Sequence, residues 1–409
     1  MSLHKLTRIL LVAAACGAFT GCNGGLFGPK PPTTSAIDAQ AAGRRSDPAV
    51  VPASATAPVA PDAGAVAASD GPKKEEKKGF DIADLAPENI YKNAKKAVGL
   101  GPDEKIARQN LKEGEDLFRQ QKYADAVARF STAMDRWPDS TLEEDAHFLL
   151  GESYFFSDQY SKAHDTFGEL LKKHNNSRYL DTIMARQFAI GRYWEQMYRK
   201  SPSWPITPNL TDKSRPLFDT FGNAINAYNT IRTYDPTGPL ADDAVMATAN
   251  AYFAKNDFEN AAFHYDLLRK EYPSSEFQQQ AHILGLQSKL RIYQGKDYEG
   301  GPLNDAEEIA KQAETQFGPR LGAERERVAE TARKIVEMKA ERDWNIGQYY
   351  ETKKAYRAAR ITYDGLVKAY PNTRFADMAR QRLEAIRDKP DLPPNHFKWL
   401  TDIFPSELN

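Results

Sequence analysis

Small and aromatic side chains recur at fixed offsets along the chain from Ile106 onward. The first copy of this pattern comprises Gly114, Leu117, Tyr123, Ala126, Phe130, Ala133 and Pro138. The pattern predicts two antiparallel helices in each copy, because small residues let the helices approach closely while aromatic residues fill the gap to the next copy. Each helix pair is too small to be stable alone, so we expect the copies to stack side by side.

Three further copies repeat the same residue types, and the first of them begins 37 residues after Gly114. The offsets match the tetratricopeptide pattern of about 34 residues, which predicts an all-α solenoid of helical hairpins. The three copies comprise Gly151, Tyr154, Tyr160, Ala163, Phe167 and Leu170; Ala249, Tyr252, Phe258, Ala261, Tyr265, Leu268 and Pro273; and Gly347, Tyr350, Tyr356, Ala359, Tyr363, Leu366 and Pro371.

Prolines mark the ends of the second helices, since proline lacks an amide hydrogen and disfavours helix at the residue before it. New helices are expected soon afterwards. Ser140 with Glu143, and Ser275 with Gln278, have the spacing of a capping box, which satisfies the free amides of a helix start. The four boundary prolines are Pro138, Pro236, Pro273 and Pro371.

Two weaker copies fill the gaps and bring the expected number of hairpins to six. In one, Gly191 and Trp194 lie in the first helix, and an insertion of roughly residues 199–217 delays the second helix, which carries Tyr228. In the other, 278–293 and 303–317 form a looser pair, and a long helical run of about 323–354 follows.

The first residues have the layout of a secretory signal, with Lys5 and Arg8 ahead of an apolar run that starts at Ile9. The segment Phe19-Thr20-Gly21-Cys22 resembles a bacterial lipobox, in which Cys22 would be cleaved, acylated and left as the new N-terminus. The alternative is an incidental cysteine in an ordinary signal peptide. Cys16 is the weaker acceptor, because it would leave a very short apolar segment.

These features divide the chain into five parts. Residues 1–21 are the expected lipoprotein signal peptide, and 22–79, rich in Ala and Pro, are an expected disordered tether with an average reach of about 40–50 Å. A lead-in segment, 80–105, precedes the repeat domain, 106–388. The C-terminal tail, 389–409, is apolar between prolines and is expected to cover the final repeat.

Charge and cysteine content narrow the function classes. The chain has 55 basic and 56 acidic residues, for a formal charge of -1, which argues against a general affinity for nucleic acid or anionic lipid. Both cysteines lie in the first 22 residues, so the folded part forms no disulfide and no thiolate metal site.

We find no catalytic motif and predict no enzyme activity, no cofactor and no metal. His147, His164 and His174 lack the spacing of a helical ligand pair, so we interpret them as surface or packing residues.

The remaining function is the binding of proteins or peptides, which solenoids achieve on the face lined by the first helix of each repeat. The alternative for each aromatic residue is packing between repeats. Trp204 lies in the proline-rich insertion, which is either a partner contact or a plain surface loop. The predicted partner-binding residues are Phe118, Phe148, Phe155, Phe156, Phe188, Arg192, Gln196, Trp204, Met246, Asn250 and Phe253.

The lipobox, the polar tether and the repeats ending in PDS, PSS and PNT together resemble the outer-membrane assembly lipoproteins of the BamD type. The resemblance covers Ile106 to about Arg387. It implies a periplasmic scaffold, anchored to the outer membrane, whose partner is the β-barrel assembly machinery or its substrates. Asn23 stands where aspartate would signal inner-membrane retention.

The sequence departs from this family in its long tether, the insertion near Pro205 and the longer C-terminal half. Two alternatives therefore stay open. One is a tetratricopeptide lipoprotein that coordinates cell-wall or envelope maintenance, and the other is an enzyme with a cryptic site in the segment between repeats.

Overall fold

A computed structural model describes residues 101–391 of the chain. The expected signal peptide, Cys22, the tether, the lead-in as far as residue 100 and the tail from residue 392 lie outside the described residues. Among the helices of 101–391, none has the length and apolar character needed to cross a membrane.

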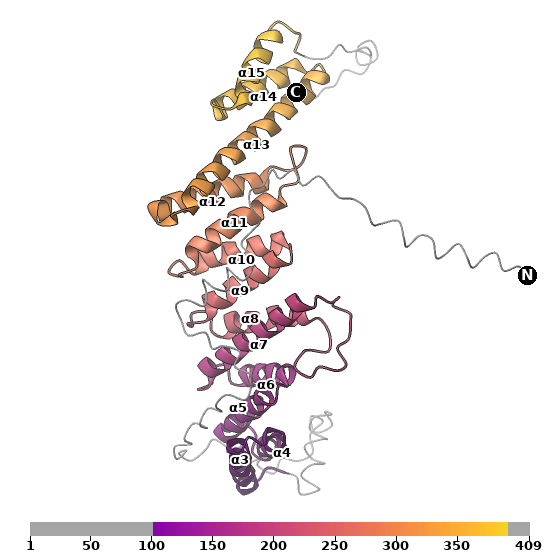
Figure 1. Cartoon of the computed structure of the whole chain (residues 1–409), viewed down its shortest axis with the longest axis vertical. Helices are drawn as coiled ribbons and strands as arrows, with labels where there is room; N and C mark the ends of the chain where they lie inside the picture. The colour runs from indigo at the N-terminus through magenta and orange to yellow at the C-terminus, as the bar shows by residue number, and fades with distance from the viewer. Residues whose placement is uncertain (1–100, 392–409) are drawn as a thin grey trace, which may run out of the picture. The chain divides into compact units, whose positions relative to one another are not determined.

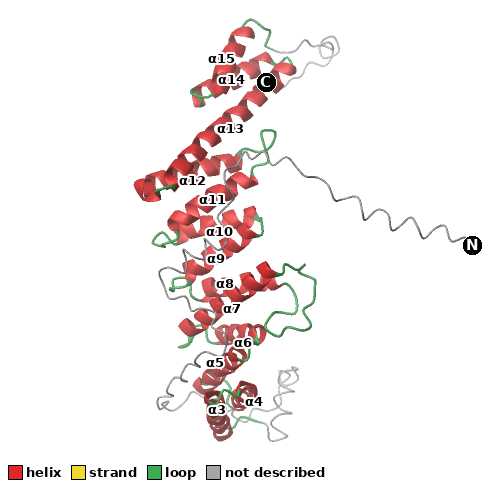
Figure 2. Cartoon of the chain, in the orientation of Figure 1, coloured by secondary structure: helices red, strands yellow, loops and turns green. Residues whose placement is uncertain are grey.

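Residues 101–391 form thirteen α-helices and one short 3-10 helix, without a strand (Figures 1 and 2). The predicted all-α fold of tetratricopeptide-like hairpins is confirmed. In chain order the helices are α3 (Glu104–Arg119), α4 (Tyr123–Arg136), α5 (Thr141–Phe156), α6 (Tyr160–Lys173), α7 (Leu180–Lys200), α8 (Thr220–Tyr234), α9 (Ala241–Ala254), α10 (Phe258–Glu271), α11 (Gln278–Ile292), α12 (Gly301–Phe317), η2 (Gly318–Leu321), α13 (Glu324–Thr352), α14 (Tyr356–Ala369) and α15 (Arg374–Ala385).

The helices pair into six hairpins, α3/α4, α5/α6, α7/α8, α9/α10, α11/α12 and α13/α14, and α15 packs on the last of them. Each helix packs mainly against its neighbours in chain order, so every hairpin contacts the next one along the chain. This is the connectivity of a repeat protein, in which burial accumulates between adjacent units.

The same turn closes four of the hairpins. Its central residue has a left-handed backbone, with φ of 60° at Gln121, 57° at Asp158, 62° at Asn256 and 57° at Lys354. In each turn this residue donates its amide hydrogen to the carbonyl three residues earlier, as from Asp158 to Phe155 at 3.1 Å. The hairpins therefore repeat in backbone geometry as well as in residue type.

Four glycines sit directly against aromatic rings of the second helix in their hairpin. A β-carbon at Gly114 would lie 2.6 Å from the nearest carbon of the Phe130 ring, closer than real contacts allow. The close approach that the sequence predicts thus depends on the missing side chain. The glycine–ring pairs are Gly114 with Phe130, Gly151 with Phe167, Gly191 with Tyr228, and Gly347 with Tyr363.

One of the two expected capping boxes forms. Ser140 Oγ accepts a hydrogen bond from the Glu143 amide at 3.2 Å, and Glu143 Oε2 accepts one from the Asp139 amide at 2.6 Å. Glu143 therefore reaches one residue further back than the usual box. Together these bonds satisfy two amides at the start of α5.

The second expected capping box, at Ser275 and Gln278, is wrong. Phe277 is the N-cap of α11, and Ser275 Oγ accepts a hydrogen bond from its amide at 3.1 Å. The side chain of Gln278 is buried and donates instead to the Leu268 and Tyr272 carbonyls, at 3.1 Å and 2.7 Å. The glutamine satisfies the end of α10, and so links two consecutive hairpins.

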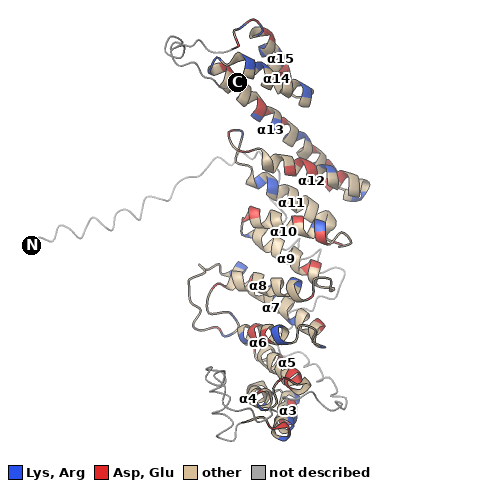
Figure 3. Ribbon diagram, turned by 180° about the vertical axis from the view of Figure 1, so that it is seen from behind, with Lys and Arg blue, Asp and Glu red and all other residues tan. Residues whose placement is uncertain are grey.

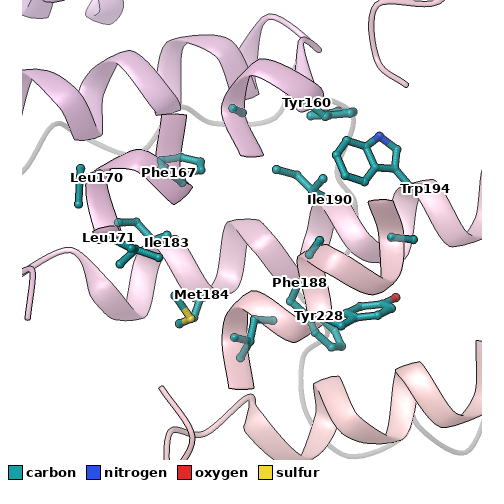
Figure 4. Close-up of a cluster of buried hydrophobic side chains, with 14 of the residues drawn as sticks. Tyr160, Phe167, Leu170, Leu171, Ile183, Met184, Phe188, Ile190, Trp194 and Tyr228 are labelled. Carbon is teal, nitrogen blue, oxygen red and sulfur yellow. The ribbon is translucent and has the colours of Figure 1, made fainter. Parts of the chain in front are cut away.

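The core between α6, α7 and α8 is built from large side chains that are almost fully buried (Figure 4). The indole of Trp194 and the ring of Tyr228 lie on the same side of this cluster in Figure 4. The labelled residues are Tyr160, Phe167, Leu170, Leu171, Ile183, Met184, Phe188, Ile190, Trp194 and Tyr228.

Buried charge also links the hairpins. The Glu152 side chain on α5 is 2% exposed and accepts two hydrogen bonds from Arg186 on α7, at 2.8 Å and 2.9 Å. The guanidinium carbon of Arg186 lies 4.6 Å from the ring centroid of Phe155 and 5.1 Å from that of Phe156. Arg186 thus forms a bidentate pair with the buried Glu152 carboxylate and also stacks on aromatic rings, two roles that the planar guanidinium of arginine can fill together.

Candidate functional site

The predicted insertion forms an ordered loop, residues 201–219, between α7 and α8 (Figure 1). Two side chains of α7 hold its base. Trp194 donates its indole N–H to the Ser214 carbonyl at 2.8 Å, and the Tyr193 hydroxyl lies 2.8 Å from Ser214 Oγ. Because Ser214 Oγ donates to Asp212 Oδ1 at 2.5 Å, Tyr193 is the donor to Ser214.

Hydrogen bonds within the loop fix its backbone. The Asn209 side-chain amide donates to the Asp212 carbonyl at 2.6 Å, and Asn209 Oδ1 accepts from the Asp212 amide at 3.1 Å. The Asn209 amide donates to the Leu217 carbonyl at 2.7 Å, and the Asp219 amide donates to Pro205 at 3.0 Å. These bonds join the two arms of the loop at two points, residues 205 with 219 and residues 209 with 217.

Asp212 is the charged centre of the loop. Burial would raise the pKa of its carboxyl, but hydrogen bonds from Ser214 and Arg215 outweigh burial and hold the pKa below its usual range. Arg215 Nε lies 2.9 Å from Asp212 Oδ2. Asp212 is therefore a carboxylate at neutral pH, and its lone pairs organise the backbone around Ser214.

A pocket of about 490 Å³ lies where the loop meets the turn between α5 and α6. Tyr160 donates to Asp158 Oδ1 at 2.8 Å, and burial raises the pKa of this tyrosine. The centroids of the Tyr160 and Tyr193 rings are 4.9 Å apart. The lining consists of Ser157, Asp158, Tyr160, Tyr193, Asp212, Lys213 and Ser214.

The chemistry of this lining suits recognition. Aromatic faces, hydroxyl groups and two carboxylates can contact a side chain or a peptide backbone. We therefore interpret the pocket as a binding site.

The segment 204–210 of the loop, called the tip below, exposes apolar side chains. The Thr207 amide donates to the Trp204 carbonyl at 2.9 Å and closes a turn with Pro205 at its second position, a place that proline favours. Trp204 is 77% exposed and Ile206 82% exposed. Leu210 is 81% exposed. Leu217 and Phe218, on the returning arm, are about half exposed.

Five of the predicted partner-binding residues are buried between helices. Phe118 packs against Phe156, with ring centroids 5.8 Å apart, and Phe188 packs against Tyr228 at 5.6 Å. A partner contact by these side chains would require them to become exposed, and in this structure they fill the core instead. The five are Phe118, Phe148, Phe156, Phe188 and Met246.

The other predicted residues are accessible to different degrees. Phe155 and Phe253 are half-buried, and so are Arg192 and Asn250. Asn250 Oδ1 accepts a hydrogen bond from Tyr265 at 2.8 Å. Gln196 is exposed, like Trp204. A binding role for these six stays a prediction, and of them Trp204 belongs to the ordered loop.

Sequence reasoning missed the pocket. Tyr193, Ser214 and Asp158 come from α7, the loop and the α5–α6 turn, and only tertiary structure brings them together. The high proline content of the insertion was the one signal available, and it indicated a stiff segment without showing what it packs against.

The histidines do not form a metal site within the described part of the chain, where no group of three or more candidate ligands occurs. Burial lowers the pKa of His147. His164 Nδ1 lies 2.6 Å from Gln187 Oε1, a contact between two adjacent hairpins.

Comparison with known protein families agrees with the fold. Two family models, both described as tetratricopeptide repeat, match residues 117–186 and 220–276. The chain therefore carries tetratricopeptide repeats in these segments, and the loop 201–219 lies between the two matches. A comparison with curated proteins finds no match.

Proposed function

We propose that this protein is a non-catalytic scaffold that binds protein partners in the bacterial periplasm. The observation that carries the proposal is the row of tetratricopeptide hairpins, each packed on the next, with a pocket formed by the α5–α6 turn, α6, α7 and the loop. Proteins of this repeat class typically use such continuous helical surfaces to bind other proteins. The mixture of tyrosine rings, hydroxyls and charge in the pocket fits a peptide or side chain of a partner.

The finer proposal is a lipid-anchored role at the outer membrane, in the assembly of β-barrel proteins. Its support is the sequence: the lipobox-like segment at Cys22, Asn23 after it, and repeats that end in PDS, PSS and PNT. A role in cell-wall or envelope maintenance is the alternative outcome of the test below.

The partner test is co-purification of the full chain from gently solubilised envelopes, with Asp158→Asn as the pocket variant. Asparagine tolerates the left-handed backbone at this position, so the change removes charge from the pocket and keeps the turn. We expect the wild type to recover a β-barrel insertase and the variant to recover about three- to tenfold less, since truncating a charge at an interface weakens binding.

Asp125→Asn, at an exposed position in the first turn of α4, is the matched control and should recover as much as the wild type. Recovery of division or peptidoglycan proteins in place of the insertase would favour the alternative role. If no protein is enriched by the wild type, the scaffold proposal is wrong.

The anchor is tested by fractionation. We expect Cys22→Ala to move the protein from the membrane fraction to the soluble periplasmic fraction, because the acyl chains provide the stable attachment. Cys16→Ala is the control and should stay with the membrane. Retention of the Cys22→Ala protein in salt-washed membranes would contradict lipidation as the anchor.

A further inference from the structure

The tip of the loop is apolar, exposed and flanked by basic residues. Trp204, Ile206 and Leu210 each keep more than three quarters of their surface in solvent. No acidic residue occurs from Arg199 to Thr211. From 199 to 219 the chain has four basic residues, Arg199, Lys200, Lys213 and Arg215, and two acidic residues, Asp212 and Asp219. Arg199 pairs with Glu195 and Arg215 with Asp212, each at 2.9 Å. Both lysines are exposed.

This exposure is built into the loop. The segment 201–219 contains no glycine and has prolines at 202, 205, 208 and 216, so its backbone has little freedom to fold the tip back. Hydrogen bonds at Asn209 and Asp219 tie its arms together, and Trp194 holds its base. Clusters of exposed apolar side chains generally mark contact with a partner or a membrane.

We propose that the tip of this loop docks on an anionic phospholipid bilayer, with Trp204, Ile206 and Leu210 entering the headgroup region. Tryptophan favours the membrane–water interface, because its ring is apolar and its N–H is polar. Lys200 and Lys213, which are exposed on either side of this segment in the sequence, add attraction to anionic lipid. The loop leaves α7 and α8 as a projection in Figures 1 and 3. Exposed apolar side chains on such a loop fit a fluid surface, whereas a protein partner would need a matching cavity.

The net charge of -1 gives the whole chain no long-range attraction to such a surface. Contact is therefore short-range and reversible. In the cell it rests on the proposed anchor at Cys22, which makes docking intramolecular and raises the effective concentration of lipid at the loop. Docking would then orient the pocket at the base of the loop relative to the membrane.

Vesicle flotation tests the proposal with the chain from residue 22 onward carrying Cys22→Ala. The vesicles are phosphatidylglycerol mixed with phosphatidylethanolamine, or phosphatidylcholine alone. We expect stronger binding to the anionic mixture, and at least a tenfold lower partition coefficient for Trp204→Ser/Ile206→Ser. Phe263→Ser, at a position on α10 that is 60% exposed, is the control and should bind as the wild type.

A labelled cysteine gives a second measurement. The protein from residue 22 onward with Cys22→Ala has no other cysteine, so an environment-sensitive dye on Ile206→Cys reports the tip and a dye on Phe263→Cys reports α10. With anionic vesicles we expect a blue shift and protection from an aqueous quencher at position 206, and neither at 263.

Equal flotation of the double variant and the wild type, or an unshifted dye at 206, would overturn the proposal. So would a double variant that binds vesicles normally but loses a protein in the envelope co-purification, since the tip would then be a protein contact. Equal binding to phosphatidylcholine would overturn the part assigned to charge. Failure of the scaffold proposal can be told apart from failure of the membrane proposal, because Asp158→Asn should lower partner recovery and leave vesicle binding unchanged.

Discussion

Arg186→Met is expected to lower the free energy of unfolding by about 3 kcal/mol, because it leaves a buried carboxylate without its partner. The Glu152 side chain is 2% exposed, and Arg186, at 23%, reaches solvent only in part. Methionine keeps an apolar side chain of similar length beside Phe155 and Phe156, but it removes the charge, the stacked guanidinium and both hydrogen bonds to Glu152. Urea unfolding, together with hydrogen exchange of the α5 and α7 amides, measures the effect.

Two companion variants separate the causes. Arg333→Met breaks an exposed ion pair, in which the side chain of Arg333 is 67% exposed and that of Glu326 is 81% exposed. It should lower the free energy of unfolding by less than about 0.5 kcal/mol. Glu152→Met/Arg186→Met removes both charges and should recover most of the loss. If Arg186→Met costs no more than Arg333→Met, the ion pair does not hold α5 and α7 together.

Gly151→Ala is expected to lower the free energy of unfolding by about 1–2 kcal/mol, although alanine favours a helix. A β-carbon at this position would lie under 3.0 Å from the Phe167 ring, so the ring or a helix must shift. Overpacking of this kind costs about 1–3 kcal/mol, which exceeds the gain in helix propensity of up to about 1 kcal/mol. Urea unfolding measures the change.

Gly168→Ala is the control from the same hairpin. Its β-carbon would meet nothing within 4 Å, so only the gain in helix propensity remains, about 0.5–1 kcal/mol. Glycine to alanine should therefore lower the free energy of unfolding at position 151 on α5 and raise it at position 168 on α6. Equal effects at the two positions would contradict the account of close helix approach at Gly151.

The hairpins could be predicted because local and tertiary signals agree. Pro138 follows the end of α4, and Gly151 lies where the repeat requires a small residue against Phe167. Each signal acts within one hairpin, so a single sequence reveals it. The capping box at Ser275 failed because the buried side chain of Gln278 serves α10 in the preceding hairpin.

The binding face could be predicted only in part. Twelve of the sixteen residues of α5 are buried, because neighbouring hairpins cover it on more than one side. In such a helix, apolar periodicity no longer separates an exposed face from a buried one. Phe148 and Phe156 were therefore expected on a binding face and pack in the core, while Trp204, outside any repeat, is exposed.

The hydrogen bond from Trp194 to Ser214 means that the conformation of the loop depends on the folding of the core around Trp194. An indole has a single hydrogen-bond donor, and here a buried core residue donates it to the base of the loop. We expect the loop to take up its position only once α7 has packed on α6, where the Trp194 ring lies against His164. A partly folded chain would therefore present neither tip nor pocket, and a partner that contacts this region would in effect select molecules whose central hairpin is complete.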